Sequence, residues 1–235
     1  MIKAVLIDID DTLLDFVAAT KEAMRVGFEK FSLGKYDESV HEIFKGINSK
    51  MWRDLEEGSI TFEELKRTRW NNVFKALNIT FDGYEFELYF REFLFNCAIH
   101  VDGAKELLDY LKGKYVLACA SNGPFEQQIN RLKVGGFYNY FNHHFISEAV
   151  GHQKPSKEFF SFCLNEINER LSNGGKEKLL PDEVIMIGDS LTSDIAGAIG
   201  SGIKCIYFDS HKKGSPDNIK PDYTVTSLKE ICKIL

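Results

Sequence analysis

The sequence predicts an α/β fold, in which a doubly wound, Rossmann-like parallel sheet carries an inserted all-helical domain. Five short runs of aliphatic residues have the near-continuous apolar character of strands that are buried on both faces. Amphipathic segments of helix length separate most of these runs, and this alternation is typical of a parallel sheet with helices on both faces. The interval between the first two runs is far longer than one crossover helix requires.

The elements of the sheet domain follow from these patterns in chain order. The expected strands are residues 4–9, 115–121, 143–147, 184–189 and 203–208. The expected helices of this domain are residues 102–112, 124–134, 156–171 and 191–200. Segments rich in Gly, Pro, Asn, Asp and Lys predict surface loops at residues 171–183 and 209–222.

The long first interval predicts a separate helical domain. Most of it has helical character, in four segments at residues 16–33, 39–58, 61–78 and 85–98. We therefore expect a helical domain over residues 16–99, and a sheet domain formed by residues 1–15 and 100–235. The stretches at residues 15–17 and 99–102 are the expected hinges.

Composition narrows the classes of function. The net charge of −6 argues against a surface that binds nucleic acid polymers or anionic membranes, although a metal or a local basic cluster would still allow a small anionic substrate. No apolar stretch reaches the roughly 18 residues of a membrane span, and no signal peptide is recognisable. The five cysteines are scattered and contain no C-x-x-C pair, which predicts a reduced, cytoplasmic protein. Nothing distinguishes a monomer from a homodimer.

Acidic residues gather where strands end. Asp8, Asp10 and Asp11 lie at the end of the first expected strand, Asp189 ends the fourth, and Asp194 follows it. The carboxyl ends of parallel strands meet at one edge of such a sheet, which is where these folds bind ligands. Crowded carboxylates repel one another unless a cation neutralises them, and oxygen ligands of this kind suit Mg²⁺. The sequence therefore predicts a magnesium site at this edge.

Three further groups at the same edge suit phosphate chemistry. Ser121 ends the second expected strand, Asn122 follows it, and Lys154 precedes the helix at residues 156–171. Phosphoryl transfer needs a nucleophile, stabilisation of charge and a proton for the leaving group. Asp8 is the candidate nucleophile, and Asp10 could protonate the leaving alcohol and later activate water. Ser121 and nearby N–H groups could bind phosphate oxygens, and Lys154 supplies a positive charge.

This ordered set of residues resembles the motifs of the haloacid dehalogenase (HAD) superfamily of phosphohydrolases, over essentially the full chain. The four motifs read, in order, Asp8, Asp10 and Thr12; Ser121; Lys154; and Gly188, Asp189 and Asp194. The resemblance implies a Mg²⁺ ion held by Asp8, the backbone carbonyl of Asp10 and Asp189. It implies that Asp194 holds the water shell of the metal or orients Lys154. The phosphate contacts that we expect are Thr12, Ser121, Asn122 and Lys154. Asp11 lies outside the motifs and is expected to cap or to face solvent.

The position of the helical insertion matches the C1 cap of the same superfamily, which closes over the active site. The segments "MWRDLEEGSITFEELKRTRW", "FISEAVGHQKP" and "MIGDSLTSDIAGAIGSGI" resemble bacterial house-cleaning pyrimidine nucleotidases, which hydrolyse UMP, dUMP and dTMP. This resemblance implies a pyrimidine nucleoside 5'-monophosphate as substrate. Phe16, just after the first motif, and Trp52 are the candidate substrate contacts.

The leading hypothesis is a Mg²⁺-dependent phosphomonoesterase that acts through an aspartyl-phosphate on a small phosphorylated metabolite. A phosphosugar phosphatase or phosphomutase of the same superfamily is the alternative. A 2-haloacid dehalogenase is disfavoured because it has no need of the metal site that Asp10 and Asp189 imply. A receiver-like phospho-signalling domain also combines acids, a hydroxyl and a lysine around Mg²⁺, but receivers are much shorter and lack a cap.

Overall fold

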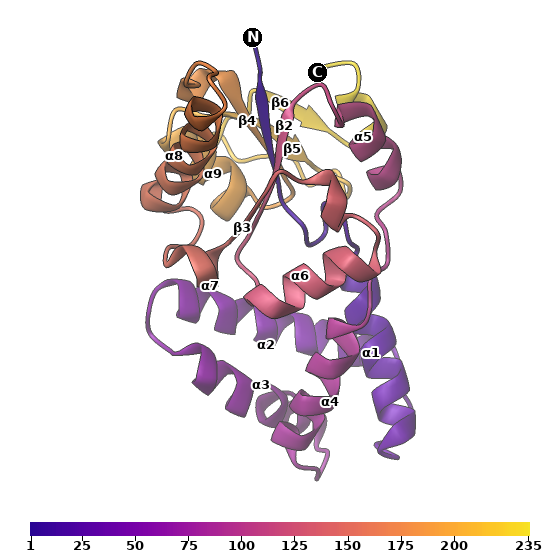
Figure 1. The fold of residues 1–235 in the computed structure, drawn as a ribbon. Helices are drawn as coiled ribbons and strands as arrows, with labels where there is room; N and C mark the ends of the chain where they lie inside the picture. Colours follow the sequence, from indigo (N-terminus) through magenta and orange to yellow (C-terminus); the bar gives the residue numbers. More distant parts are fainter. The chain divides into compact units, whose positions relative to one another are not determined.

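A six-stranded parallel sheet is the centre of the larger of two compact units (Figure 1). The protein is described by a computed structural model that covers residues 1–235, apart from the side chain of Glu56. The sheet order is β3-β2-β1-β4-β5-β6. The chain winds one way from β1 to β3 and the other way from β4 to β6, so the switch point lies between β1 and β4. The strands are β1 (Ala4–Ile7), β2 (Val116–Ser121), β3 (His143–Ile146), β4 (Val184–Gly188), β5 (Lys204–Phe208) and β6 (Tyr223–Val225).

The central strands are buried on both faces, which is why they appear in the sequence as continuous apolar runs. Every residue of β1 is buried. Val5 and Ile7 contribute to one hydrophobic cluster and Ala4 and Leu6 to another, because successive side chains of a strand point to opposite faces. Parallel registry with both neighbours places Ile7 opposite Cys119 of β2 and Ile187 of β4.

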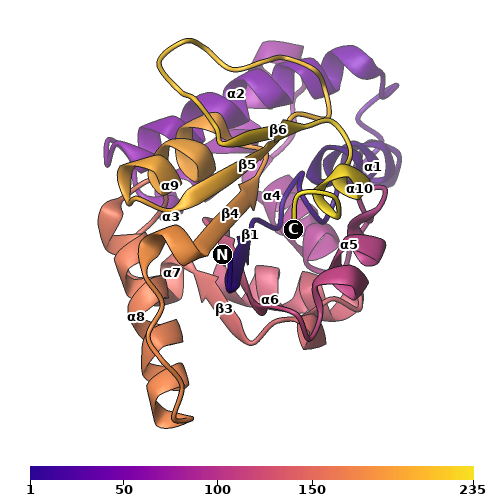
Figure 2. The same cartoon turned by 90° about the horizontal axis from the view of Figure 1, so that it is seen from above.

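Helices cover both faces of this sheet (Figure 2). One face packs against α5 (Ala104–Leu111), α6 (Phe125–Val134) and α10 (Leu228–Ile231), and the other packs against α8 (Lys157–Asn173) and α9 (Ala196–Gly200). The shorter elements of the unit are η1 (Tyr138–Tyr140), α7 (Ser147–Val150), η2 (Pro181–Glu183) and the π-helical turn η3 (Leu191–Ile195). The sheet unit comprises residues Met1–Phe16 and Ala98–Leu235.

The second unit, Val17–Cys97, is helical. Local sequence explains where its helices begin: Asp37 accepts from the N–H of Ser39 at 2.9 Å, Thr61 forms a capping box with Glu64, and Asp82 caps the last helix. The helices are α1 (Phe16–Lys30), α2 (Glu38–Glu56), α3 (Phe62–Leu77) and α4 (Gly83–Phe95). Buried aromatic rings form its interior, namely Phe28, Phe44, Trp70, Phe74, Phe86 and Phe90.

The two stretches that connect the units pair with each other. Asp15 donates its N–H to the carbonyl of Ile99 at 2.8 Å, and Val101 donates to Leu13 at 3.0 Å. A bridge between Leu14 and His100 lies between these two bonds. These residues border or fall within the stretches expected as hinges, and a hinge motion there stays a prediction.

The predicted fold class is confirmed, and each expected strand coincides with an observed one to within two residues. β6 was not expected, since its three residues include only one buried apolar side chain, Val225. The single helix expected at residues 191–200 begins instead as a π-helical turn and continues as α9. Within the described residues, no helix has both the length and the apolar character to cross a membrane.

Candidate active site at the carboxyl edge of the sheet

Asp8 follows β1 directly, at the switch point of the sheet. Its N–H donates to the carbonyl of Ile187 at 2.9 Å, which continues the pairing with β4. The residue is only 7% exposed, and Oδ1 accepts from Nζ of Lys154 at 2.7 Å. Burial raises the pKa of Asp8 to about 8; Lys154 opposes this shift, whereas Asp194 and Asp10 add to it. Even with Lys154 beside it, the carboxyl group of Asp8 is costly to ionise.

Lys154 is the central cation of the site. Its Nζ donates to Oδ1 of Asp8 at 2.7 Å, to Oδ1 of Asp194 at 2.6 Å and to the carbonyl of Ala120 at 2.7 Å. An ammonium has three donors, so all of them are engaged here. Burial lowers the pKa of Lys154, but Asp194 and Asp8 outweigh burial and raise the pKa above its ordinary value. The lysine is therefore protonated at neutral pH.

Asn122 holds the backbone of Lys154. The N–H of Lys154 donates to Oδ1 of Asn122 at 2.9 Å, and Nδ2 of Asn122 donates to the carbonyl of Lys154 at 2.8 Å. The side-chain amide of Asn122 is thus used in positioning the lysine. A phosphate contact from Asn122 stays a prediction.

Asp194 lies on the π-helical turn η3, an irregularity that is frequent at functional sites. It is fully buried, and while Oδ1 accepts from Lys154, Oδ2 accepts from the N–H of Ser190 at 3.1 Å. A Cβ at position 188 would lie 2.2 Å from Oδ2 of Asp194, so Gly188 is required for this close approach.

Carboxylate oxygens of Asp8, Asp189 and Asp194 lie within 4.8 Å of one another. Burial raises the pKa of Asp189 well above its ordinary value, and the charges of Asp8 and Asp194 raise it further. A hard divalent cation would relieve this repulsion, and clustered carboxylate oxygens are ligands that Mg²⁺ prefers. The donor set therefore fits Mg²⁺, with Asp8 and Asp189 as the side chains that would hold it. The backbone carbonyl of Asp10 stays a predicted ligand.

Asp10 is held by two side chains that sequence reasoning missed. Its side chain is 30% exposed, and its oxygens accept from Nη1 of Arg131 and, at 2.8 Å, from Nε2 of Gln128. Gln128 also donates to Oγ of Ser121 at 2.7 Å. Gln128 and Arg131 are three residues apart on α6 and share its buried face with Leu132. Two polar residues at core-facing positions of an amphipathic helix were the signal that could have revealed them.

The remaining predicted residues have separate environments. Asp11, at a positive φ of 56°, accepts the N–H of Phe16 at 2.8 Å, which confirms the expected capping role. The ring of Phe16 lies 5.5 Å from the guanidinium of Arg131.

Thr12 is fully buried, and its Oγ1 has no hydrogen-bond partner among the described residues. Trp52 belongs to the helical unit, where its ring centroid lies 6.1 Å from that of Phe62. Substrate contacts from Phe16 and Trp52, and a phosphate contact from Thr12, stay predictions.

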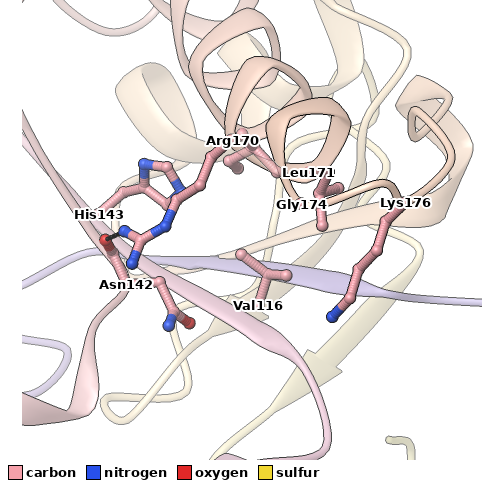
Figure 3. Close-up of a pocket in the computed structure, with 8 residues that line it drawn as sticks. Val116, Asn142, His143, Arg170, Leu171, Gly174 and Lys176 are labelled. Carbon is pink, nitrogen blue, oxygen red and sulfur yellow. Dashed lines mark hydrogen bonds between the residues drawn. The ribbon is translucent and has the colours of Figure 1, made fainter.

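Two other features of the molecule lack the chemistry of the cluster around Asp8. In the helical unit, Glu38, His41 and Glu42 gather on the first turns of α2, but Nζ of Lys21 already donates to Glu38 at 2.6 Å. A cavity of about 200 Å³ lies beside the first residues of β2 and β3, where Val116, His143 and Arg170 line it (Figure 3). Arg170 there donates to the carbonyl of Asn142 at 2.6 Å. None of the residues that line this cavity is acidic, so it offers no metal site comparable to that around Asp8.

Comparison with known proteins places this geometry in a family. The chain is 32% identical to HAD-hydrolase YfnB of Bacillus subtilis over 233 residues, which are 99% of this chain and 95% of YfnB. A crystal structure of YfnB bound to magnesium matches with a TM-score of 0.88, over 100% of this chain and 98% of that one.

Two further relatives are named pyrimidine 5'-nucleotidases. PynA of Streptococcus pneumoniae is 32% identical, over 99% of this chain and 94% of PynA. YjjG of Escherichia coli is 29% identical, over 97% of this chain and 95% of YjjG. A family model described as haloacid dehalogenase-like hydrolase matches residues 2–202. The chain therefore belongs to the haloacid dehalogenase-like hydrolases.

Proposed function

We propose that this hydrolase is a Mg²⁺-dependent phosphomonoesterase whose substrate is a pyrimidine nucleoside 5'-monophosphate. The observation that carries the proposal is the buried Asp8, bonded through one oxygen to Lys154 and clustered with Asp189 and Asp194. The names of PynA and YjjG support the choice of substrate class. A bound Mg²⁺ would supply charge neutralisation for the phosphate and the carboxylates.

The geometry supports a two-step reaction. In the first step a carboxylate oxygen of Asp8 attacks phosphorus, while Lys154 holds the side chain through Oδ1. A bond forms between this oxygen and phosphorus as the ester P–O bond breaks, and Asp10, in its protonated form, gives its proton to the leaving alkoxide. Water then attacks the aspartyl-phosphate, Asp10 takes a proton from that water, and inorganic phosphate leaves with Asp8 restored.

Residues 16–99 are proposed as the cap of this enzyme. The described crystal structure of YfnB is reported to reveal interdomain movement, and the paired linkers around Leu14 and His100 are where such movement would originate in this chain. Trp52, on the proposed cap, and Phe16, at its boundary, are the proposed substrate contacts. The expected partners are small phosphorylated metabolites, not nucleic acid polymers or membranes. The free cysteines support a reducing, cytoplasmic location.

Release of inorganic phosphate from a panel of esters tests the function. The panel comprises UMP, dUMP, dTMP, AMP, GMP and several sugar phosphates, each with Mg²⁺ and with EDTA. We expect Mg²⁺-dependent release that favours the pyrimidine nucleotides. Preference for sugar phosphates would overturn the substrate class while leaving the chemistry in place. Conversion of a hexose 1-phosphate to its 6-phosphate would identify a mutase, and stable phosphorylation of Asp8 without release would identify a phospho-signalling domain.

A further inference from the structure

Gln128 and Arg131 connect two groups of the proposed active site that come from different strands. Asp10 follows β1, and Ser121 ends β2. Nε2 of Gln128 lies 2.8 Å from Oδ2 of Asp10 and 2.7 Å from Oγ of Ser121. Nη1 of Arg131 bonds Oδ1 of Asp10 and lies 3.0 Å from Oε1 of Gln128. The four side chains therefore form one connected network.

The direction of every hydrogen bond in this network is determined by chemistry. A guanidinium can only donate, so the atom of Gln128 that faces Arg131 must be its carbonyl oxygen. The amide nitrogen of Gln128 must then face Asp10 and Ser121, and its two N–H groups match these two acceptors. No flipped or alternative arrangement of the amide satisfies all three contacts.

This arrangement also orients the hydroxyl of Ser121. Its oxygen has two acceptor positions, and these receive Nε2 of Gln128 and, at 3.2 Å, the N–H of Gly123. The O–H hydrogen of Ser121 must therefore point away from both donors, as a donor to another group. A phosphate oxygen is the acceptor that the proposed function supplies.

The fold alone does not account for these two residues. Gln128 and Arg131 are fully buried, and burying an amide and a guanidinium costs more than burying apolar side chains of the same size. The surrounding chain makes room for them: a Cβ at Gly123 would lie 2.7 Å from Cδ of Gln128. The ring of Phe16 covers Arg131. The site is thus built around the pair rather than merely tolerating it.

We propose that Gln128 and Arg131 are positioning residues, which hold the carboxyl group of Asp10 for proton transfer to the leaving group and direct the hydroxyl of Ser121 toward phosphate. This inference rests on the proposed function. Both oxygens of Asp10 accept hydrogen bonds from residues of α6, Oδ1 from Arg131 and Oδ2 from Gln128, so the carboxyl group cannot rotate freely. Loss of either residue would free the side chain of Asp10, which is 30% exposed, to adopt other rotamers.

A comparison of two substrates tests this role. UMP has an alkoxide leaving group that needs a proton, whereas the nitrophenolate of p-nitrophenyl phosphate leaves without one. The ratio of their kcat/KM values reports the first chemical step and does not depend on the fraction of enzyme that is folded. In Gln128→Met and Arg131→Met we expect kcat/KM for UMP to fall about 10²-fold, at the lower end of the range for general acid catalysis, and kcat/KM for p-nitrophenyl phosphate to fall several-fold at most.

Matched variants serve as controls. Gln127→Met makes the same change one residue earlier on α6, and Lys133→Met removes an exposed cation from that helix. Both should keep the wild-type ratio, and Arg131→Lys, which preserves charge but not the guanidinium fork, should recover part of the loss. Inhibition by inorganic phosphate should weaken several-fold in Gln128→Met, and this change should disappear when Ser121 is already replaced by Ala.

Equal losses for both substrates in Gln128→Met and Arg131→Met, or no loss, would overturn the positioning role while leaving the proposed function intact. Absence of phosphate release from either substrate by the wild-type protein would overturn the function itself, and the inference with it.

Discussion

Each unit of the molecule contains a buried ionic group, and the two groups differ in charge balance. In the helical unit, Arg69 and Glu87 are 6% and 1% exposed at their side chains and pair at 2.7 Å. Nη1 of Arg69 also donates to Asn48 at 2.8 Å, and its guanidinium lies over the rings of Phe44 and Phe90. One cation thus meets one carboxylate, with most of its donors satisfied.

The sheet unit gathers charges that do not balance. The carboxylates of its cluster are Asp8, Asp10, Asp189 and Asp194, and its cations are Lys154 and Arg131. Burial raises the pKa of Glu87 as well as that of Asp8, so both units pay a desolvation penalty. In the sheet unit, neighbouring charges of the same sign raise the pKa of Asp8 further, whereas the charges that act on Glu87 are cations that lower its pKa. The difference teaches that burial of charge alone does not indicate a functional site. An excess of negative charge at the carboxyl ends of neighbouring strands does.

The largest expected effect is on the unbalanced group. Asp8→Asn should reduce phosphate release by about 10⁵-fold or more, as removal of a covalent nucleophile does, because an amide oxygen cannot form the phospho-enzyme. The variant should stay folded, since Asn still offers an acceptor to Lys154 and removes one repelling charge. Phosphate release and circular dichroism on the same sample check this. Substantial residual turnover would refute the assignment of Asp8 as nucleophile.

The balanced group should respond in stability and not in chemistry. Glu87→Leu leaves Arg69 buried without its partner and should lower the free energy of unfolding by about 3–5 kcal/mol. The double variant Arg69→Met/Glu87→Leu should recover most of this loss, since it removes both desolvated charges. Urea unfolding measures both values. If the double variant were as unstable as the single one, the ion pair itself would stabilise the helical unit. The loss in Glu87→Leu would then not come from leaving Arg69 buried without a partner.

The third prediction concerns metal and pH, where the effect is smallest over a single pH unit. The pKa of Asp8 is about 8 in the folded protein against 3.8 ordinarily, so between these values the folded state binds one more proton than the unfolded state. Without metal, stability should therefore be greatest at low pH within this window and fall as pH rises toward 8, by at most about 1.4 kcal/mol per pH unit for this group. The raised pKa of Asp189 acts in the same direction.

Added Mg²⁺ should reverse this loss, by about 2.7 kcal/mol at a concentration one hundred times Kd. Thermal melting with EDTA and with Mg²⁺, at pH 6 and pH 8, checks the prediction: the shift caused by Mg²⁺ should be larger at pH 8. Asp8→Asn should show a flatter pH dependence. Equal Mg²⁺ shifts at both pH values in the wild-type protein would contradict the assignment of the cation to these carboxylates.

Much of this architecture was predictable from the sequence because the central strands are buried on both faces. Buried strands such as β1 and β4 admit few polar residues, so their apolar runs are unambiguous and Asp8 and Asp189 stand out at their ends. The edge strand β6 carries no such signal, since two of its three residues are exposed. The π-helical turn of η3 was not predictable either, and its Asp194 contacts Lys154, which lies 40 residues away in sequence.

The candidate site was only partly predictable for the same reason. Asp8, Asp10 and Thr12 form a local motif, whereas Gln128 and Arg131 have no local signature beyond two polar residues on the buried face of α6. Their partner Asp10 lies 118 and 121 positions away along the chain. Pairings over such separations depend on how α6 packs on the sheet, and one sequence does not contain that information.

The sheet order has a consequence for how the protein is made. β1 is synthesised first, yet it lies between β2 and β4, and both of these neighbours leave the ribosome later. The helical unit, contiguous in sequence, is complete before β1 meets either neighbour. At a translation rate of about 5–20 residues per second, roughly 10–40 seconds pass between the addition of Asp8 and the addition of Asp194. During translation the nascent chain is therefore an inactive precursor with solvated acids, and catalytic competence arrives only with the last third of the polypeptide.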